Sequence, residues 1–130
     1  MKQFWILMLL SLMLLTACGQ TTEKKQETVY RNITAEDARK IMDSEEGYVI
    51  LDVRTQAEYD EGHIPGAVLI PNTEIEDRAE EELPDKDQLI LVYCRSGNRS
   101  KKAAQALAAL GYTNIREFGG ILDWPYEVEK

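Results

Sequence analysis

One short segment of the chain concentrates residue types that carry out nucleophilic chemistry. From position 94 to position 100 it reads Cys-Arg-Ser-Gly-Asn-Arg-Ser. An ionised cysteine is a strong nucleophile, and a nearby guanidinium can bind an oxyanion through two hydrogen bonds. Gly97 allows a backbone conformation that a Cβ atom would resist. We therefore predict that Cys94 is the catalytic nucleophile. The remaining loop residues are predicted to bind its substrate: Arg95, Ser96, Gly97, Asn98, Arg99 and Ser100.

The elements on either side of this segment explain why its cysteine should be reactive. The apolar run 88–93 predicts a buried strand, and residues 100–110 predict a helix with an apolar face. Backbone N–H groups at such a junction converge on one point, and the helix dipole adds positive charge there. We expect Cys94 to be largely a thiolate. The alternative interpretations are a small buried cysteine and, for Arg95 and Arg99, an ordinary solvated loop.

Strands and helices alternate along the rest of the chain. Thr34 and Thr55 each stand three residues before an acidic residue, the pattern of a capped helix start. Further apolar runs at 48–51, 67–70 and 115–118 predict strands, and residues 75–83 an acidic helix. This order predicts an α/β fold with a small, mostly parallel central sheet flanked by helices on both faces. Ligands of such folds bind beyond the carboxyl ends of the strands, where residues from Asp52 onward and from Cys94 onward should meet.

Charge and composition exclude several function classes. The chain has 15 basic and 23 acidic residues and a net charge of −8, so it lacks the basic face that nucleic-acid binding needs. A four-ligand structural zinc site is excluded, because His63 is the only histidine and Cys18 and Cys94 are the only cysteines. We expect a monomer. The acidic stretch 74–87 is best interpreted as a solvated helix face, with a basic partner protein as the alternative.

The first 28 residues differ from the rest. Residues 4–15 are apolar apart from Ser11, too few to span a bilayer but of the length found in secretory signals. They end at Leu15-Thr16-Ala17-Cys18, which resembles the lipobox of bacterial lipoproteins. We predict a signal peptide over residues 1–17, a lipid on Cys18, a flexible tether over residues 18–28 and a folded domain over 29–130. The protein would then be exported and anchored to a membrane of the bacterial envelope. An ordinary signal peptide and an uncleaved anchor are the alternatives.

Four motifs in the predicted domain together resemble the rhodanese homology domain in order and spacing. They are Asp52-Val53-Arg54, the segment 58–67 (Glu-Tyr-Asp-Glu-Gly-His-Ile-Pro-Gly-Ala), the loop 94–100, and Gly119-Gly120 with Trp124. The resemblance covers about residues 30–125. It implies a small α/β domain, no cofactor, and a loop cysteine that carries sulfur as a persulfide.

Carried over to this chain, the resemblance implies that Cys94 takes a sulfane sulfur from thiosulfate or a similar donor and passes it to a thiol or cyanide, in two covalent half-reactions. Phosphatases and arsenate reductases of the family have five residues between cysteine and arginine, whereas four separate Cys94 from Arg99. The shorter loop favours sulfur transfer. A lipid-anchored sulfur carrier or docking module with little turnover of its own is the alternative function.

Two further groups have a structural and a functional interpretation. His63 is interpreted as a structural contact rather than a catalytic base, because the loop already ionises the thiol. Asp52 and Arg54 are predicted to form an ion pair that supports the loop, with direct substrate contact as the alternative.

Overall fold

The computed structural model of the chain describes residues 30–130. The predicted signal segment, the lipidation site Cys18 and the tether lie outside these residues. Within 30–130, no helix has the length and apolar character needed to cross a bilayer.

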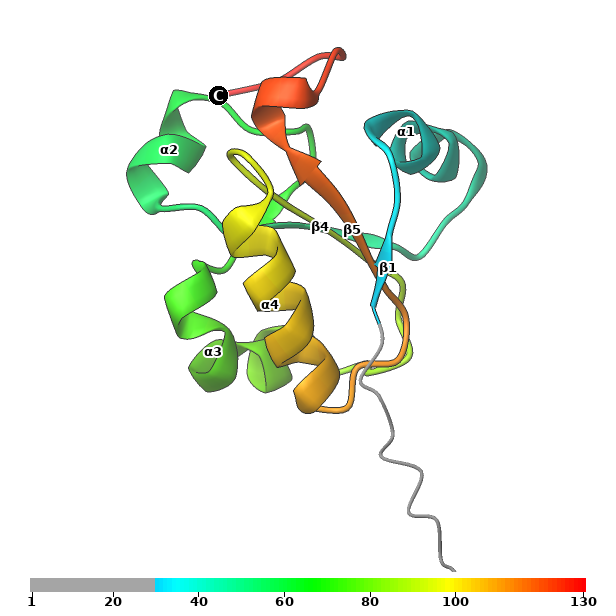
Figure 1. The fold of residues 1–130 in the computed structure, drawn as a ribbon, viewed down its shortest axis with the longest axis vertical. Helices are drawn as coiled ribbons and strands as arrows, with labels where there is room; N and C mark the ends of the chain where they lie inside the picture. The colour runs from blue at the N-terminus through cyan, green and yellow to red at the C-terminus, as the bar shows by residue number, and fades with distance from the viewer. Residues whose placement is uncertain (1–29) are drawn as a thin grey trace, which may run out of the picture.

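A five-stranded sheet forms the centre of the domain, with the strand order β1-β5-β4-β2-β3 (Figure 1). Every pairing between these strands is parallel, which confirms the predicted sheet. The strands are β1 (Arg31–Asn32), β2 (Val49–Asp52), β3 (Val68–Leu69), β4 (Ile90–Cys94) and β5 (Ile115–Gly120). β1 has no counterpart among the predicted strands, because its two residues are polar and exposed at the sheet edge.

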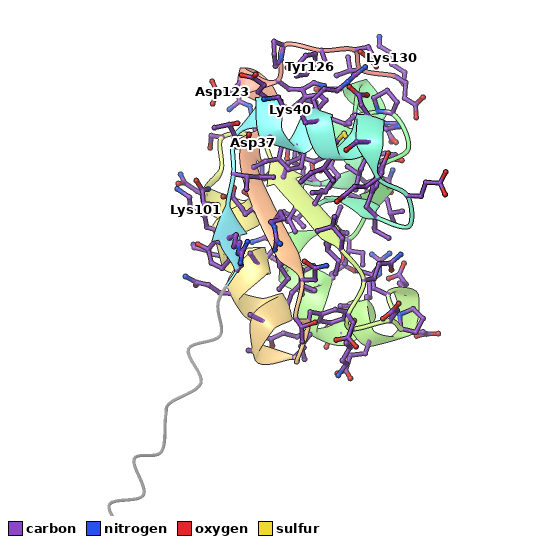
Figure 2. All side chains as sticks on the ribbon, turned by 90° about the vertical axis from the view of Figure 1, so that its right-hand side faces the viewer. Asp37, Lys40, Lys101, Asp123, Tyr126 and Lys130 are labelled. Carbon is purple, nitrogen blue, oxygen red and sulfur yellow. The ribbon has the colours of Figure 1, made fainter. Side chains whose placement is uncertain are left out.

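Helices cover both faces of the sheet, as predicted. α3 (Ile75–Glu82) and α4 (Asn98–Ala109) pack on one face, and α1 (Ala35–Ser44) packs on the other (Figure 1). Charged side chains on the outer side of α1, such as Asp37 and Lys40, are exposed (Figure 2). The remaining helical segments are α2 (Gln56–Glu61) and the short 3₁₀ turns η2 (Asn72–Glu74) and η3 (Ile121–Asp123).

The residues of β4 alternate between two apolar cores, one on each face of the sheet. Ile90, Val92 and Cys94 belong to the core beneath α3 and α4, whereas Leu91 and Tyr93 belong to the core beneath α1. All five are buried, as expected for a central strand covered on both sides. This alternation decides that the sulfur of Cys94 lies on the α4 side of the sheet.

Local sequence signals place the helix starts. Thr34 and Thr55 are the N-caps of α1 and α2, and each forms the complete capping box that its spacing predicts. Two other helix boundaries differ from the sequence pattern. α1 ends at Ser44, before Gly47, and α4 begins at Asn98, two residues earlier than its apolar pattern indicates. Its start is set instead by the left-handed Gly97, so the last residues of the reactive segment lie within the helix.

Candidate active site

The segment after Cys94 makes a tight turn from the end of β4 into α4. Gly97 is the N-cap of α4 and has a φ of 105°, a left-handed conformation that other residues adopt with strain. A Cβ on Gly97 would also touch the Cα of Gly119 at 3.5 Å. The turn packs still more tightly on Gly120, where a Cβ would lie 2.0 Å from the carbonyl oxygen of Arg95. The Gly-Gly pair at the end of β5 therefore forms the floor on which this turn rests.

The sulfur of Cys94 lies inside this turn, within hydrogen-bond distance of Gly97 and Ser100. The N–H of Gly97 is 3.0 Å from Sγ and the hydroxyl oxygen of Ser100 is 3.4 Å away. Burial alone raises the pKa of the Cys94 thiol. Hydrogen bonds from the Ser100 hydroxyl and from the backbone N–H groups of Ser100, Gly97 and Ser96 outweigh burial and lower the pKa below its ordinary value. The geometry thus forms the amide cradle expected at this junction, and the donors come from the turn and from α4.

Arg99, predicted to bind substrate, is already engaged by a carboxylate. Its two terminal nitrogens donate to the two oxygens of Glu58 in α2, at 2.7 and 2.9 Å. Hydrogen bonding by Arg99 is the main reason that the pKa of Glu58 falls to about 2, with the backbone and hydroxyl of Thr55 contributing. The pair joins α2 to the first turn of α4. Binding of a donor anion by Arg99 would require this pair to rearrange, so its substrate-binding role stays a prediction.

Three further residues of the segment lie at the surface of the domain. Arg95, Ser96 and Asn98 are exposed, whereas Gly97 and Ser100 are buried. The carbonyl oxygen of Arg95 accepts a hydrogen bond from the N–H of Leu122 at 3.2 Å, which ties the turn to η3. The side chain of Arg95 is exposed next to Cys94 in the sequence, and its role in substrate binding stays a prediction.

Asp52 and Arg54 form the expected ion pair, and it is buried. Their closest contact is 2.7 Å, with relative exposures of 0% and 5%. Arg54 also donates to the carbonyl oxygen of Gly62 at 2.8 Å. Tyr93, which the sequence analysis does not single out, donates its hydroxyl to Asp52 at 2.7 Å and accepts from the N–H of Ile64 at 3.1 Å. This network joins the ends of β2 and β4 to the segment after α2, one position away from Cys94.

His63 makes structural contacts. Its ring stacks on Tyr59 with 3.7 Å between centroids, and Nδ1 lies 2.9 Å from the carbonyl oxygen of Tyr59. Its backbone pairs with Glu129 in an isolated antiparallel bridge, and Nε2 lies 3.4 Å from the carboxylate of the same residue. These contacts hold the C-terminal segment against the turn after α2, in agreement with the structural interpretation.

Glu117 is a residue of the site that the sequence reasoning missed. Its side chain is fully buried in β5 and its Oε1 atom accepts from the Ser100 hydroxyl at 2.7 Å and from the N–H of Gly119 at 2.8 Å. The amide of Asn32 in β1 donates to its other oxygen. The sequence does contain a signal. Glu117 stands two positions after the buried Ile115, and so occupies an inward position of the strand.

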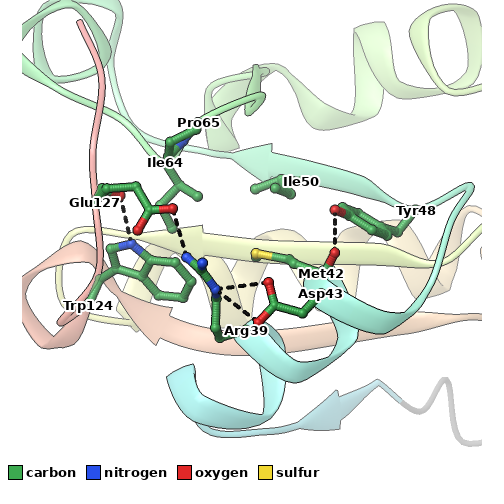
Figure 3. A pocket seen from close by; sticks show the side chains of 9 residues that line it. All are labelled: Arg39, Met42, Asp43, Tyr48, Ile50, Ile64, Pro65, Trp124 and Glu127. Carbon is green, nitrogen blue, oxygen red and sulfur yellow. Dashed lines mark hydrogen bonds and ion pairs between the residues drawn. The ribbon is translucent and has the colours of Figure 1, made fainter.

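A cavity of about 180 Å³ lies on the opposite side of the sheet (Figure 3). Arg39 of α1 borders it and binds both Asp43 and Glu127. Its apolar lining includes Ile50, Ile64 and Trp124 from the core beneath α1, whereas Cys94 belongs to the other core. The cavity is lined by Arg39, Met42, Asp43, Tyr48, Ile50, Ile64, Pro65, Trp124 and Glu127. No residue of the reactive segment is among them, so the cavity is separate from the cysteine site.

Comparison with known proteins gives relatives with sulfur chemistry in their names. Thiosulfate sulfurtransferase PspE of Escherichia coli is 37% identical over 73 residues, covering 56% of this chain and 70% of that protein. The putative sulfur carrier protein YrkF of Bacillus subtilis is 40% identical over 98 residues, covering 75% of this chain. The chain spans only 52% of YrkF, about half of that relative's length.

Solved structures share the fold. A rhodanese with anions from E. coli superimposes with a TM-score of 0.60 at 34% identity, covering 64% of this chain and 98% of that one. The BH2092 protein of Bacillus halodurans gives a TM-score of 0.68 at 32% identity, covering 76% of each chain. The rhodanese-like domain family matches residues 34–126, a range that includes the whole amide cradle and the floor of two glycines beneath it. With its parallel sheet, its cysteine turn and this match, the chain belongs to the rhodanese-like family.

Proposed function

We propose that the protein is a sulfurtransferase that carries sulfur on Cys94. The observation that supports this most directly is the sulfur atom of Cys94 within a turn whose N–H groups and Ser100 hydroxyl lower the pKa of the thiol. A thiolate is the form that attacks sulfur. The names of two relatives, a thiosulfate sulfurtransferase and a putative sulfur carrier, agree with this chemistry.

The reaction proceeds in two half-reactions. In the first, the Cys94 thiolate attacks the outer sulfur of thiosulfate or a similar donor. The sulfur–sulfur bond of the donor breaks, a bond from Sγ to the outer sulfur forms, and sulfite leaves with the electron pair. In the second, a thiolate or cyanide attacks the outer sulfur, and Cys94 is released as a thiolate. Donors of the turn stabilise the negative charge that Sγ carries before the first step and after the second.

Peptide mass spectrometry tests the covalent step at a single residue. The full chain is incubated with thiosulfate and cleaved with trypsin without reductant. The peptide 87–95, which contains Cys94 but not Cys18, should gain the mass of one sulfur atom and lose it on treatment with cyanide. The Cys94→Ser variant should show no thiosulfate-dependent turnover. Full turnover by this variant would refute the mechanism.

A sulfur carrier with little turnover of its own is the second candidate, favoured by the name of the Bacillus subtilis relative. Both candidates form the persulfide on Cys94, so that adduct does not distinguish them. Steady-state release of sulfite, measured with cyanide or a small thiol as the acceptor, distinguishes the two candidates. Sustained turnover supports the enzyme, whereas a single stoichiometric loading that small acceptors discharge slowly supports the carrier.

We further propose that the mature protein is lipidated on Cys18 and held at a bacterial membrane. The support is the sequence itself: an apolar segment over 4–15 that ends at Leu-Thr-Ala-Cys, followed by a polar stretch of about ten residues. Such a stretch has a root-mean-square reach of roughly 18 Å. Two acyl chains anchor a protein stably, whereas one does so only marginally.

Membrane fractionation tests the anchor. Protein made in its bacterial host should sediment with membranes, resist extraction by high salt and enter detergent. Cys18→Ser should leave the precursor with residues 1–17 attached, while sulfur transfer through Cys94 persists. A freely secreted wild-type protein, or a mature N-terminus other than Cys18, would contradict the proposal.

A further inference from the structure

A buried carboxylate lies beneath the reactive cysteine, and the sulfur-transfer steps above do not use it. Glu117 has no exposed surface. Among residues 30–130, no lysine, arginine or histidine forms a salt bridge with it, and its partners are the neutral donors Asn32, Ser100 and Gly119. Burying a carboxylate without a cation is costly even when its oxygens accept hydrogen bonds. An apolar side chain could fill this position without the cost of burying a charge, so packing alone does not explain the carboxylate.

Ser100 connects Glu117 to the sulfur. Its hydroxyl oxygen is 2.7 Å from Oε1 of Glu117 and 3.4 Å from Sγ of Cys94. The carbonyl oxygens of Gly97 and Gly119 lie 3.0 and 3.3 Å away and can only accept. A hydroxyl has a single proton and donates one hydrogen bond at a time. Ser100 therefore cannot donate to Cys94 and to Glu117 together.

This restriction links the protonation of the two outer groups. When Ser100 donates to the Glu117 carboxylate, its oxygen can only accept from sulfur, and the contact with Cys94 is a hydrogen bond only if Cys94 is a thiol. When Cys94 is a thiolate, Ser100 donates to sulfur, and the short contact to Oε1 is satisfied only if Glu117 supplies the proton. Among the arrangements in which Ser100 donates to one of these two groups, two satisfy both contacts of its hydroxyl, and they differ by the shift of one proton along the chain of three groups.

We propose that Glu117 is a positioning residue that shares one proton with Cys94 through Ser100. The S–H bond of Cys94 breaks as its proton passes to the Ser100 oxygen, and the electron pair stays on sulfur. At the same time the Ser100 hydroxyl proton passes to Oε1 of Glu117. The negative charge moves from carboxylate to sulfur, and no proton enters or leaves the protein. The thiolate thus forms without a second buried charge, and the reverse shift reprotonates Cys94 after sulfur is handed on.

Coupling of this kind predicts a distinctive pH profile. Two groups that share protons titrate as a pair, in two macroscopic steps. When Cys94 and Glu117 are both protonated, no thiolate is present. When the two groups share one proton, a fraction of the molecules has the thiolate, and when neither group is protonated, all of them do. The rate of Cys94 alkylation should therefore rise in two steps separated by a plateau.

Other charged groups near the pair are fixed in partnerships or, like the exposed Arg95, keep their charge throughout the titration because a guanidinium does not lose its proton in proteins. Arg99 of α4 attracts the charge on Cys94, and it is paired with Glu58 of α2. Asp52 of β2 also acts on Arg99 and is itself paired with Arg54. The facing residue from β1 is the neutral Asn32. The two steps are therefore assigned to the pair of Cys94 and Glu117.

Residue-specific alkylation tests the inference on the full chain. Brief pulses of iodoacetamide are applied across the pH range in which circular dichroism shows the chain folded. Modification is then read from the tryptic peptide 87–95. Wild type should give two steps. Glu117→Gln, which keeps the size and an acceptor oxygen, should give one, and so should Ser100→Ala, which removes the shared hydroxyl.

Glu80→Gln is the matched control, because it removes one negative charge from the exposed face of α3, and it should retain both steps. A single step in wild type overturns the inference by itself. Two steps in Glu117→Gln overturn it as well. The inference depends on the proposed function only through the role of Cys94 as nucleophile, and alkylation needs no sulfur donor. Two steps without any persulfide on Cys94 would therefore refute the proposed function and leave the shared proton standing.

Discussion

The ion pair between Glu58 and Arg99 connects α2 to the first turn of α4, and its contribution to the free energy of unfolding can be measured directly. Its perturbation is Glu58→Gln, which removes the charge but keeps the size and one acceptor oxygen. The carboxylate is about a quarter exposed and the guanidinium about a third, and their bidentate contacts are 2.7 and 2.9 Å. Arg99 is the principal cause of the lowered pKa of Glu58.

The size of the effect follows from that pKa. A fall from the ordinary value of 4.5 to about 2 corresponds to about 3 kcal/mol, at about 1.36 kcal/mol per pKa unit. Solvent screening at a partly exposed pair reduces this to about 1–2 kcal/mol. Because the pKa is depressed in the folded state, the stabilisation is complete above pH 4.5 and is lost as the pH falls toward 2.

Urea unfolding of wild type and variant at a series of pH values measures this term. At neutral pH, Glu58→Gln should unfold with a free energy about 1–2 kcal/mol lower than that of wild type, and the difference should shrink as the pH falls from 4.5 toward 2. Glu36→Gln in α1, whose carboxylate is 70% exposed, should change stability by less than about 0.5 kcal/mol. Equal stabilities at neutral pH, or a difference that stays constant into acid, would refute the reasoning.

Three further substitutions test other contacts of the site. Gly120→Ala places a Cβ 2.0 Å from the carbonyl oxygen of Arg95, so the turn must move. The rate of Cys94 alkylation and thiosulfate turnover should each fall at least about 10-fold, which corresponds to about 1.4 kcal/mol. Unchanged alkylation would show that the floor tolerates a methyl group. Arg95→Ala, at an exposed side chain, should leave urea unfolding within about 0.5 kcal/mol of wild type. It should lower turnover by roughly 10–150-fold, since a charge-assisted contact contributes about 1.5–3 kcal/mol; wild-type kinetics would mean that the amides alone bind the donor. Tyr93→Phe removes the buried hydroxyl between Asp52 and Ile64 and should cost about 1–3 kcal/mol in urea unfolding, whereas no loss would mean that neither partner depends on it.

Local sequence signals predicted the elements of the fold well where a residue acts on its neighbours. The capping boxes at Thr34 and Thr55 require only residues three positions apart, and both form as predicted. The central strand β4 is apolar on both faces, and its burial follows directly. By contrast β1 has no apolar pattern, because its two residues pair with β5 at an exposed edge. Its existence depends on a partner more than 80 residues away.

The same distinction applies to the site. The cysteine turn is a local motif, and its donors and its left-handed glycine could be expected from the order strand, turn, helix. The partners of its side chains could not. Glu58 and Arg99 are 41 positions apart, as are Asp52 and Tyr93. Nothing in the spacing indicates that an arginine two positions into α4 faces the first turn of α2 rather than a substrate.

Glu117 shows how a charged residue can belong to a site without belonging to its motif. The recognisable features are the cysteine turn and the Gly-Gly floor. Glu117 contacts both, through Ser100 and Gly119, because β4 and β5 are neighbours in the sheet. The register that pairs Cys94 with Gly120 brings Gly119 against Gly97 and directs the carboxylate of Glu117 to Ser100. A parallel sheet gathers the ends of neighbouring strands at one edge. The reactive sulfur and the carboxylate beneath it are therefore brought together by strand order, and their chemistry is connected by the single proton of one serine.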